Sequence, residues 1–256
     1  MAVASRHRIL FVCCFAIVGF CSCLPACKEA PKRDIREYYF PVGQLRAGRV
    51  YEYLNTGASD APVSEYWYYR SFQRDSGFFL AATFYDQNFQ IGQIAREKIV
   101  ATGALAREYF LYEPDTITQQ QAPVPVNIES PNVFPFKVSD STGVFLFKLQ
   151  YHPIWEPDAT VTLVRNRRFL GDGPPFKFNG KQYASIRFDV REKISNDQDT
   201  NSDVEAYGEE WYAKGIGLVY SRKIYGAGDL TIENRLTAIF PMAELERRAK
   251  AVYGEE

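Results

Sequence analysis

The stretch Tyr183–Arg191 reads YASIRFDVR, in which apolar and polar side chains alternate. Ala184, Ile186, Phe188 and Val190 share one side, and the residues between them are polar or charged. A period of two belongs to a β-strand, whereas a helix repeats about every 3.6 residues. The stretch therefore predicts an antiparallel strand with one buried face and one solvated face.

The same period recurs along most of the chain. Phe145–His152 and Leu230–Ile239 repeat it clearly, and an Asn-Gly pair at 179–180 predicts a tight hairpin before the quoted strand. Further candidate strands are Tyr38–Phe40, Val50–Leu54, Glu65–Phe72, Phe78–Tyr85, Gln90–Ala101, Glu108–Tyr112, Val161–Arg165, Phe176–Phe178, Glu209–Tyr212 and Leu218–Ile224.

Two segments lack this period, and one other segment is helical in pattern. Gln119–Pro125 carries two closely spaced prolines and is expected to be a loop or connector, as is Asn196–Asp203. Pro241–Tyr253 predicts a short terminal helix with a narrow apolar stripe. The fold class is therefore mainly β: a curved antiparallel sheet, half-barrel or barrel, with a C-terminal helix expected to close one mouth. A two-sheet sandwich is the alternative.

Composition excludes several classes of protein. The chain has 256 residues, 46% of them hydrophobic, and a formal net charge of −1, so no global basic field exists to hold nucleic acid. All five cysteines lie in the first 27 residues, so the rest of the chain forms no disulfide.

The N-terminus has the order of a secretory signal. Arg6 and Arg8 precede the apolar run Ile9–Cys21, which is too short for a permanent membrane span of about 20 residues. The run ends at Leu24-Pro25-Ala26-Cys27, which resembles the bacterial lipobox. The resemblance implies cleavage before Cys27 and acylation of its thiol, with Cys23 as a rival acceptor. An ordinary cleaved signal and an uncleaved anchor are the alternatives.

This resemblance also implies an organisation and a location. Residues 1–26 form the signal peptide, residues 27–37 a lipidated tether and residues 38–256 a single β-rich domain. In lipoproteins of Gram-negative bacteria, aspartate after the cysteine commonly retains the protein in the inner membrane. Lys28 stands there. The expected location is therefore the outer membrane, on its periplasmic face rather than at the cell surface.

No catalytic or metal-binding pattern emerges. After signal removal the single histidine is His152, so a site needing two imidazoles cannot form within one chain. Asp197, Asp199, Asn201 and Asp203 alternate as in a calcium loop, but the glycine and glutamate of an EF-hand are missing. We expect no enzyme activity, no cofactor and no metal; hydrolysis is the least favoured of three functions considered.

Two aromatic clusters are the candidate binding residues. In the strand containing Tyr66-Trp67-Tyr68-Tyr69, both faces carry rings. One face must meet the core, and the other packs under the helix, lines an apolar cavity or stacks on a sugar ring. The second cluster is Trp211-Tyr212 in Glu209–Val219, which is similar to a hairpin of secreted β-rich bacterial lipoproteins of unknown function. Those resemble the periplasmic lipoprotein carrier and its receptor, whose curved sheets hold acyl chains.

These patterns predict a non-catalytic envelope lipoprotein. It is held to the membrane by its N-terminal lipid and is expected to bind a hydrophobic ligand, to contact another envelope protein or to act as a structural component of the outer membrane. The alternative is a glycan-binding accessory domain that uses exposed aromatic rings.

Overall fold

The structure is a computed structural model that describes residues 32–57, 59–139, 143–199, 203–226, 228 and 230–254. Most of these residues are in long strands. The strands are β1 (Arg33–Asp34), β2 (Arg49–Thr56), β3 (Val63–Arg74), β4 (Gly77–Tyr85), β5 (Ile91–Val100), β6 (Gly103–Pro114), β7 (Gln121–Pro125), β8 (Asn127–Pro135), β9 (Lys137–Val138), β10 (Val144–Tyr151), β11 (Val161–Phe178), β12 (Lys181–Asn196), β13 (Val204–Ala213), β14 (Gly217–Tyr225) and β15 (Leu230–Phe240).

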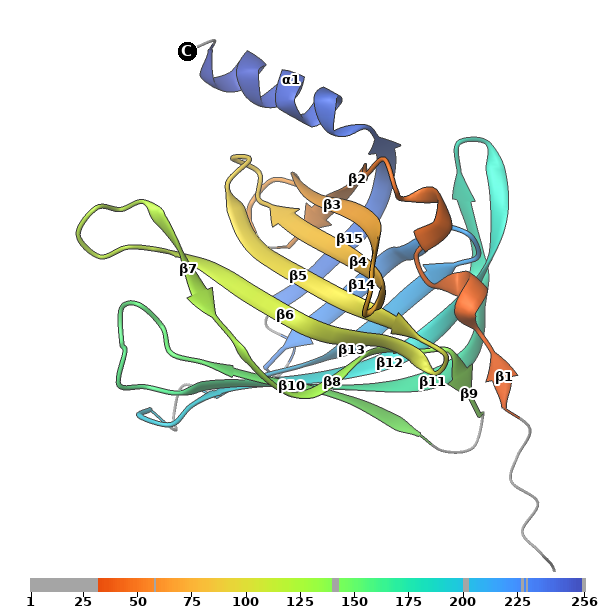
Figure 1. The fold of residues 1–256 in the computed structure, drawn as a ribbon, viewed down its shortest axis with the longest axis horizontal. Coiled ribbons are helices and arrows are strands. Elements are labelled where there is room, and N and C mark those ends of the chain that lie inside the picture. The colour runs from red at the N-terminus through yellow and green to blue at the C-terminus, as the bar shows by residue number, and fades with distance from the viewer. Residues whose placement is uncertain are drawn as a thin grey trace, which may run out of the picture.

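The main sheet closes on itself as an antiparallel barrel (Figure 1). In the described part of the chain, twelve strands form the ring in the order β5-β4-β3-β2-β15-β14-β13-β12-β11-β10-β8-β6, and β6 pairs back to β5. β7 pairs only with the C-terminal half of β6 and lies outside the ring. The predicted mainly β barrel with a terminal helix is confirmed, and the sandwich alternative is excluded.

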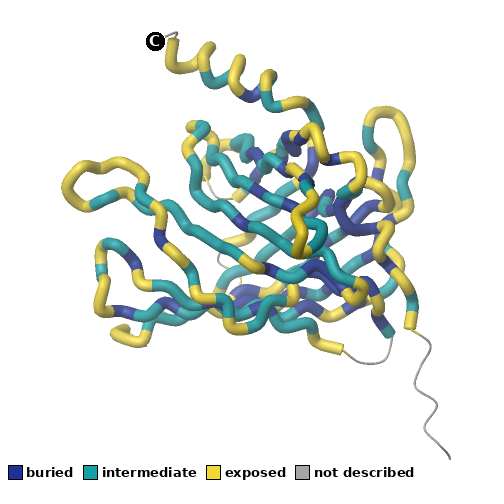
Figure 2. The backbone as a smooth tube through the Cα atoms, in the orientation of Figure 1, coloured by how far each residue is buried: buried dark blue, intermediate teal, exposed yellow. Residues whose placement is uncertain are grey.

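The alternation in the quoted stretch is the reason that β12 has an inner and an outer face. Ile186 and Phe188 are 0% exposed and Val190 is 2% exposed, and the first two belong to the main core. In β10 the predicted apolar face is likewise buried at Phe147 and Leu149. Buried positions gather toward one end of the barrel, and the loops at the other end are exposed (Figure 2). The barrel is therefore packed solidly at one end.

The N-terminal segment closes that packed end. Ile35 is 0% exposed, and Tyr39 and Phe40 join the main core. The segment forms two short 3-10 helices, η1 (Arg36–Tyr38) and η2 (Val42–Gln44). The expected strand at 38–40 is therefore wrong, because this segment crosses the barrel end instead of joining the ring. Residues 33–37, assigned to the tether from sequence, belong to the folded body, since β1 pairs with β9.

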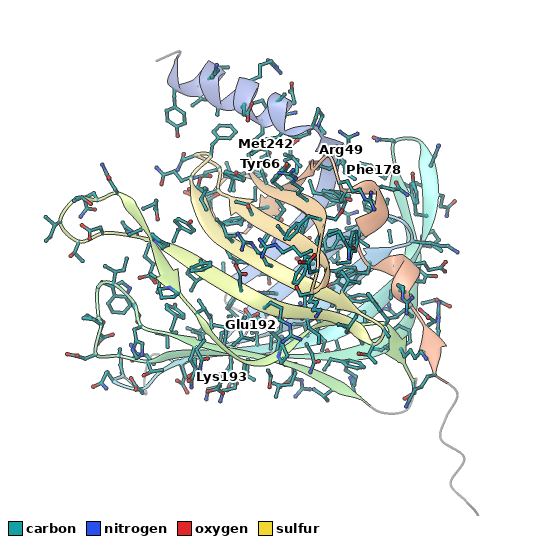
Figure 3. All side chains as sticks on the ribbon, viewed as in Figure 1. Arg49, Tyr66, Phe178, Glu192, Lys193 and Met242 are labelled. Carbon is teal, nitrogen blue, oxygen red and sulfur yellow. The ribbon has the colours of Figure 1, made fainter. Side chains whose placement is uncertain are left out.

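Helix α1 (Met242–Tyr253) lies against the outside of the barrel. Its single buried residue, Leu245, packs with Val50 and Tyr66, which are on the outer face of β2 and β3. Tyr66 and Met242 lie close together at the base of the helix (Figure 3). The helix lies at the predicted residues. The expectation that it closes one mouth of the barrel is wrong, because the N-terminal segment closes the barrel end instead.

The segment 119–125 also differs from its predicted form. β7 pairs with β6 although it carries Pro123 and Pro125. Within the described chain β7 forms no ladder on its other side, so it is an edge strand. Proline is tolerated in an edge strand because the N–H group that it lacks is not needed for a second ladder. Asn196–Asp203 is a loop wherever it is described, apart from Asn196, which ends β12.

Among the described residues, no helix is both long enough and apolar enough to cross a membrane.

Candidate functional site

A cavity of about 360 Å³ lies inside the barrel, next to the packed end. This volume is at the lower end of the range for small-molecule sites, about 300–1,000 Å³. The adjacent strands β2, β3 and β4 form an aromatic part of its wall with Tyr53, Trp67, Tyr69 and Phe84, and further rings come from the N-terminal segment, β6, β10 and β13. The aromatic lining residues are Phe40, Tyr53, Trp67, Tyr69, Phe84, Tyr109, Phe147 and Tyr212.

The facing part of the wall is charged. Arg165 and Arg167 of β11, Glu210 of β13 and Lys223 of β14 line it. β11 is six positions from β3 in either direction around the ring of twelve, so the two strands lie on opposite walls. The cavity is therefore amphipathic, with the rings of Trp67 and its neighbours facing two arginines.

Arg167 and Glu210 form a buried ion pair with two hydrogen bonds. Arg167 Nε donates to Glu210 Oε2 at 2.7 Å and Nη2 donates to Oε1 at 3.1 Å, while Nη1 donates to the Val133 carbonyl at 3.1 Å. Tyr212 Oη donates to the same carboxylate at 2.9 Å. Burial alone would raise the pKa of Glu210, but Arg167 holds that pKa below its ordinary value. Both charges are satisfied by fixed partners.

A second cluster places two cations on one carboxylate. Arg165 Nε and Lys223 Nζ both donate to Glu192, the lysine at 2.8 Å. Burial would raise the pKa of Glu192, yet the two cations lower it to about 2. Burial lowers the pKa of Lys223, and neighbouring Arg165 acts in the same direction. This cluster therefore carries one more positive charge than negative charge.

Glu97 of β5 is a carboxyl group on the cavity wall without a cationic hydrogen-bond partner among the described residues. It accepts a hydrogen bond from Tyr39 Oη of the N-terminal segment. Burial raises the pKa of Glu97 to about 7, against the opposing effects of the Tyr39 hydrogen bond and of Arg167. Near neutral pH this group is close to half protonated, so it can act as a donor as well as an acceptor.

The cavity is closed at one end and accessible at the other. Phe40 and the buried Tyr69 lie at the end that the N-terminal segment covers. Toward the other end, the lining residues Glu65, Gln93 and Lys223 are only partly buried. A ligand therefore reaches the interior from the end opposite the N-terminal segment.

His152, the one histidine of the described residues, hydrogen-bonds the Ala159 carbonyl through Nδ1 at 2.8 Å in the β10–β11 connection. Within the described ranges, no three His, Cys, Asp or Glu side chains group in a way that could hold a metal ion.

The barrel has a counterpart among solved structures. A crystal structure of a candidate lipoprotein from Parabacteroides distasonis ATCC 8503 matches with a TM-score of 0.52 and 13% sequence identity, covering 79% of this chain and 97% of that one. A candidate exported protein with a YmcC-like fold from Bacteroides fragilis NCTC 9343 gives a TM-score of 0.47 at 16% identity, covering 78% and 98%. The first likeness establishes a shared fold.

No family model matches the sequence, and no curated protein matches it either.

The aromatic residues predicted from sequence divide between the two faces of the barrel. Trp67 and Tyr69 line the cavity, as does Tyr212. Tyr66 and Tyr68 belong to the outer cluster under α1. One face of this strand thus lies at the cavity and the other lies under the helix.

Trp211 is not at the cavity. Its ring lies 4.5 Å from that of Tyr220, and its Nε1 donates to Glu209 Oε2 at 2.9 Å. Glu209 and Glu210 face opposite sides, as their adjacency predicts. Cys27, Cys23 and the remainder of the lipobox lie outside the described residues.

Sequence reasoning missed the charged residues of the wall. Arg165 and Arg167 are in phase with Leu163 and Phe169, two apolar residues of the same strand. Charged residues bracketed in phase by apolar ones are the signal that could have marked them. Likewise, extending the apolar phase of β12 past Val190 leads directly to Glu192.

Proposed function

We propose that the protein is a non-catalytic lipoprotein of the bacterial envelope that binds a hydrophobic small molecule inside its barrel. The observation that carries this proposal is the aromatic wall of the 360 Å³ cavity, where the ring centroids of Trp67 and Phe84 lie 5.2 Å apart. Rings on a concave, partly accessible surface bury the apolar part of a ligand. The accessible end gives that ligand a route in.

The same wall supports binding over catalysis. Arg167 and Glu210 hold each other in a two-bond ion pair, and Glu192 is shared by two cations. Groups fixed in this way orient a ligand but do not readily exchange protons. Enzymatic general bases, by contrast, need a free site within hydrogen-bond reach of the substrate.

We further propose that Cys27 carries the lipid anchor and that the barrel stands at the outer membrane, facing the periplasm. The lipobox-like Leu24–Cys27 and the basic Lys28 support this location. The fold shared with a candidate lipoprotein is consistent with it. Several acyl chains on one residue make a stable anchor, because each buried methylene contributes about 0.8 kcal/mol. The membrane is thus the first partner, and an envelope protein that delivers or receives the ligand is the second.

Quenching by a brominated probe tests the cavity. The full-length protein is purified from membranes and held in phosphatidylcholine nanodiscs, and ω-bromododecanol is titrated while tryptophan fluorescence is recorded; empty discs correct for partition. Bromine quenches at short range, so saturable quenching is expected in the parent. It is also expected in the control Trp155→Phe, because Trp155 is 62% exposed and does not line the cavity. It should be lost in Trp67→Phe. Saturable quenching that survives in Trp67→Phe, or that never appears, refutes binding in this cavity.

The anchor has a separate test. Intact mass of the membrane-extracted protein should give a polypeptide that begins at Cys27 and carries a diacylglyceryl group. Cys27→Ser should lose the modification, and Cys23→Ser should keep it. An unmodified mature chain would refute the anchor.

Glycan binding, the alternative from the sequence, needs a platform of exposed rings. Trp67 and Tyr69 face the cavity and Tyr66 is 6% exposed, whereas the exposed rings of Trp155 and Tyr207 are on the β10–β11 connection and on β13. The geometry therefore supports an interior hydrophobic ligand better than a surface sugar.

A further inference from the structure

The charged wall of the cavity has an unequal number of positive and negative groups. Arg167 is neutralised by Glu210, one charge against one. Arg165 and Lys223 share Glu192 alone, which leaves a single positive charge on the wall. Such a charge, partly removed from water and lacking a counter-ion, is costly.

The two cations that share Glu192 are the accessible members of the cluster. The side chains of Arg165 and Lys223 are 24% and 25% exposed, whereas Glu192 is 5% exposed. Both cations line the cavity. Within the described residues, only Nε of Arg165 hydrogen-bonds a protein acceptor, so its terminal nitrogens are available to the cavity. Glu192 points into the barrel and its neighbour Lys193 points away from it (Figure 3).

We propose that Arg165 and Lys223 form an anion subsite, and that the ligand is a single-chain amphiphile whose carboxylate binds there while its tail lies against the aromatic wall. This inference rests on the proposed function, because it assigns the head group of the ligand of the same cavity. One carboxylate balances the one surplus charge. An alkyl phosphate carries a charge of about −1.5 to −2 at neutral pH, which exceeds the surplus positive charge of the cluster.

The remaining acids of the wall do not supply the missing charge near the subsite. Glu97 is bound by Tyr39, and Glu65 accepts a hydrogen bond from Asn55 Nδ2 at 2.8 Å. Both are on other strands, β5 and β3, and burial raises the pKa of each. The guanidinium of Arg165 can bind the carboxylate with two parallel hydrogen bonds, and Lys223 adds a third.

The test compares probes that share one tail and differ in the head group. ω-Bromododecanoate, ω-bromododecanol and ω-bromododecyl phosphate are titrated at neutral pH into the full-length protein in phosphatidylcholine nanodiscs, with tryptophan quenching as the readout. Hydrogen bonds to charged groups are stronger than those between neutral groups, so the carboxylate should bind at least about tenfold more tightly than the alcohol. It should also bind more tightly than the phosphate.

Lys223→Met removes the surplus charge and leaves the pair of Arg165 with Glu192 intact. This variant should lose the tenfold preference for the carboxylate and keep the affinity for the alcohol. Lys193→Met is the matched control, since it makes the same exchange on the outer face of β12, where Lys193 pairs with Asp203 at 2.6 Å. It should bind all three probes as the parent does.

The outcomes separate the two proposals. Equal affinities for alcohol and carboxylate in the parent, or a preference that survives Lys223→Met, overturn the anion subsite and leave the hydrophobic cavity standing. Tighter binding of the phosphate overturns the carboxylate assignment. Displacement of ω-bromododecanoate by acetate at equal concentration shows a site for free anions and also overturns it. Failure of all three probes to bind overturns the proposed function together with this inference.

Discussion

Replacing Glu97 with glutamine should change how stability depends on pH. Burial raises the pKa of this carboxyl from 4.5 to about 7, against the Tyr39 hydrogen bond and Arg167. The other ionisable groups that act on this site are Tyr69 and Tyr109, which titrate well above neutrality. Glu97 is therefore the group near this site that changes charge between pH 5 and pH 9.

The sign and size of the effect follow from the shift. A carboxyl whose pKa is raised by folding binds its proton more tightly in the native state, so its stabilising contribution is complete below pH 4.5 and is lost as the pH rises through 7. At about 1.4 kcal/mol for each pKa unit, the parent should lose about 3 kcal/mol relative to Glu97→Gln between these limits. Glutamine keeps an acceptor for Tyr39 and never ionises.

Urea denaturation of both proteins at pH 5 and at pH 9 measures the effect. Relative to the variant, the parent should lose about 2.5 kcal/mol of its free energy of unfolding between pH 5 and pH 9, so the variant should gain in relative stability as the pH rises. A difference of the same size at both pH values would mean that Glu97 does not titrate in this range, and the reasoning would fail.

Three other substitutions test separate parts of the structure by denaturation. Arg167→Met leaves its buried carboxylate partner without a counter-charge and should cost about 3–5 kcal/mol, whereas Arg247→Met, in a pair whose arginine side chain is 68% exposed, should leave the midpoint unchanged. Leu245→Ala should cost about 2 kcal/mol because this residue attaches α1 to the barrel, and Val252→Ala, at a side chain 66% exposed, should cost nothing measurable. Gly217→Ala should cost about 2 kcal/mol or more, since the glycine has φ +107° and a Cβ there would lie 2.5 Å from the Phe40 ring of the N-terminal segment. A wild-type midpoint for this variant would contradict the close approach.

The period of two predicted most strands because their inner faces are apolar. Ile186, Phe188 and Val190 carry this signal without interruption. β8 escaped notice because its sequence, NIESPNVFP, contains two prolines and little alternation. Tyr38–Phe40 was misassigned because an alternation test does not distinguish a short strand from aromatic residues that cap the end of a barrel.

The candidate site was only half predictable. Adjacent rings at 66–69 must face opposite ways, but both faces are aromatic, so sequence alone cannot say which pair points inward. The charged wall was missed for a different reason. Arg167 pairs with Glu210, 43 residues further along the chain, and only strand order and register bring such residues together. Taken singly, each is a charged residue on an otherwise apolar face, and nothing in its own strand names its partner.

The floor of the cavity is built differently from its walls. The walls are strands joined by continuous ladders, whereas the floor is held by a two-residue ladder with β9, a few isolated backbone bonds and packed rings such as Phe40. The interior volume can therefore change by displacement of this segment while every strand pair of the ring stays intact. The same segment is the described part of the barrel nearest in sequence to Cys27, so tension on the lipid anchor that we propose there would act first on the chamber's base.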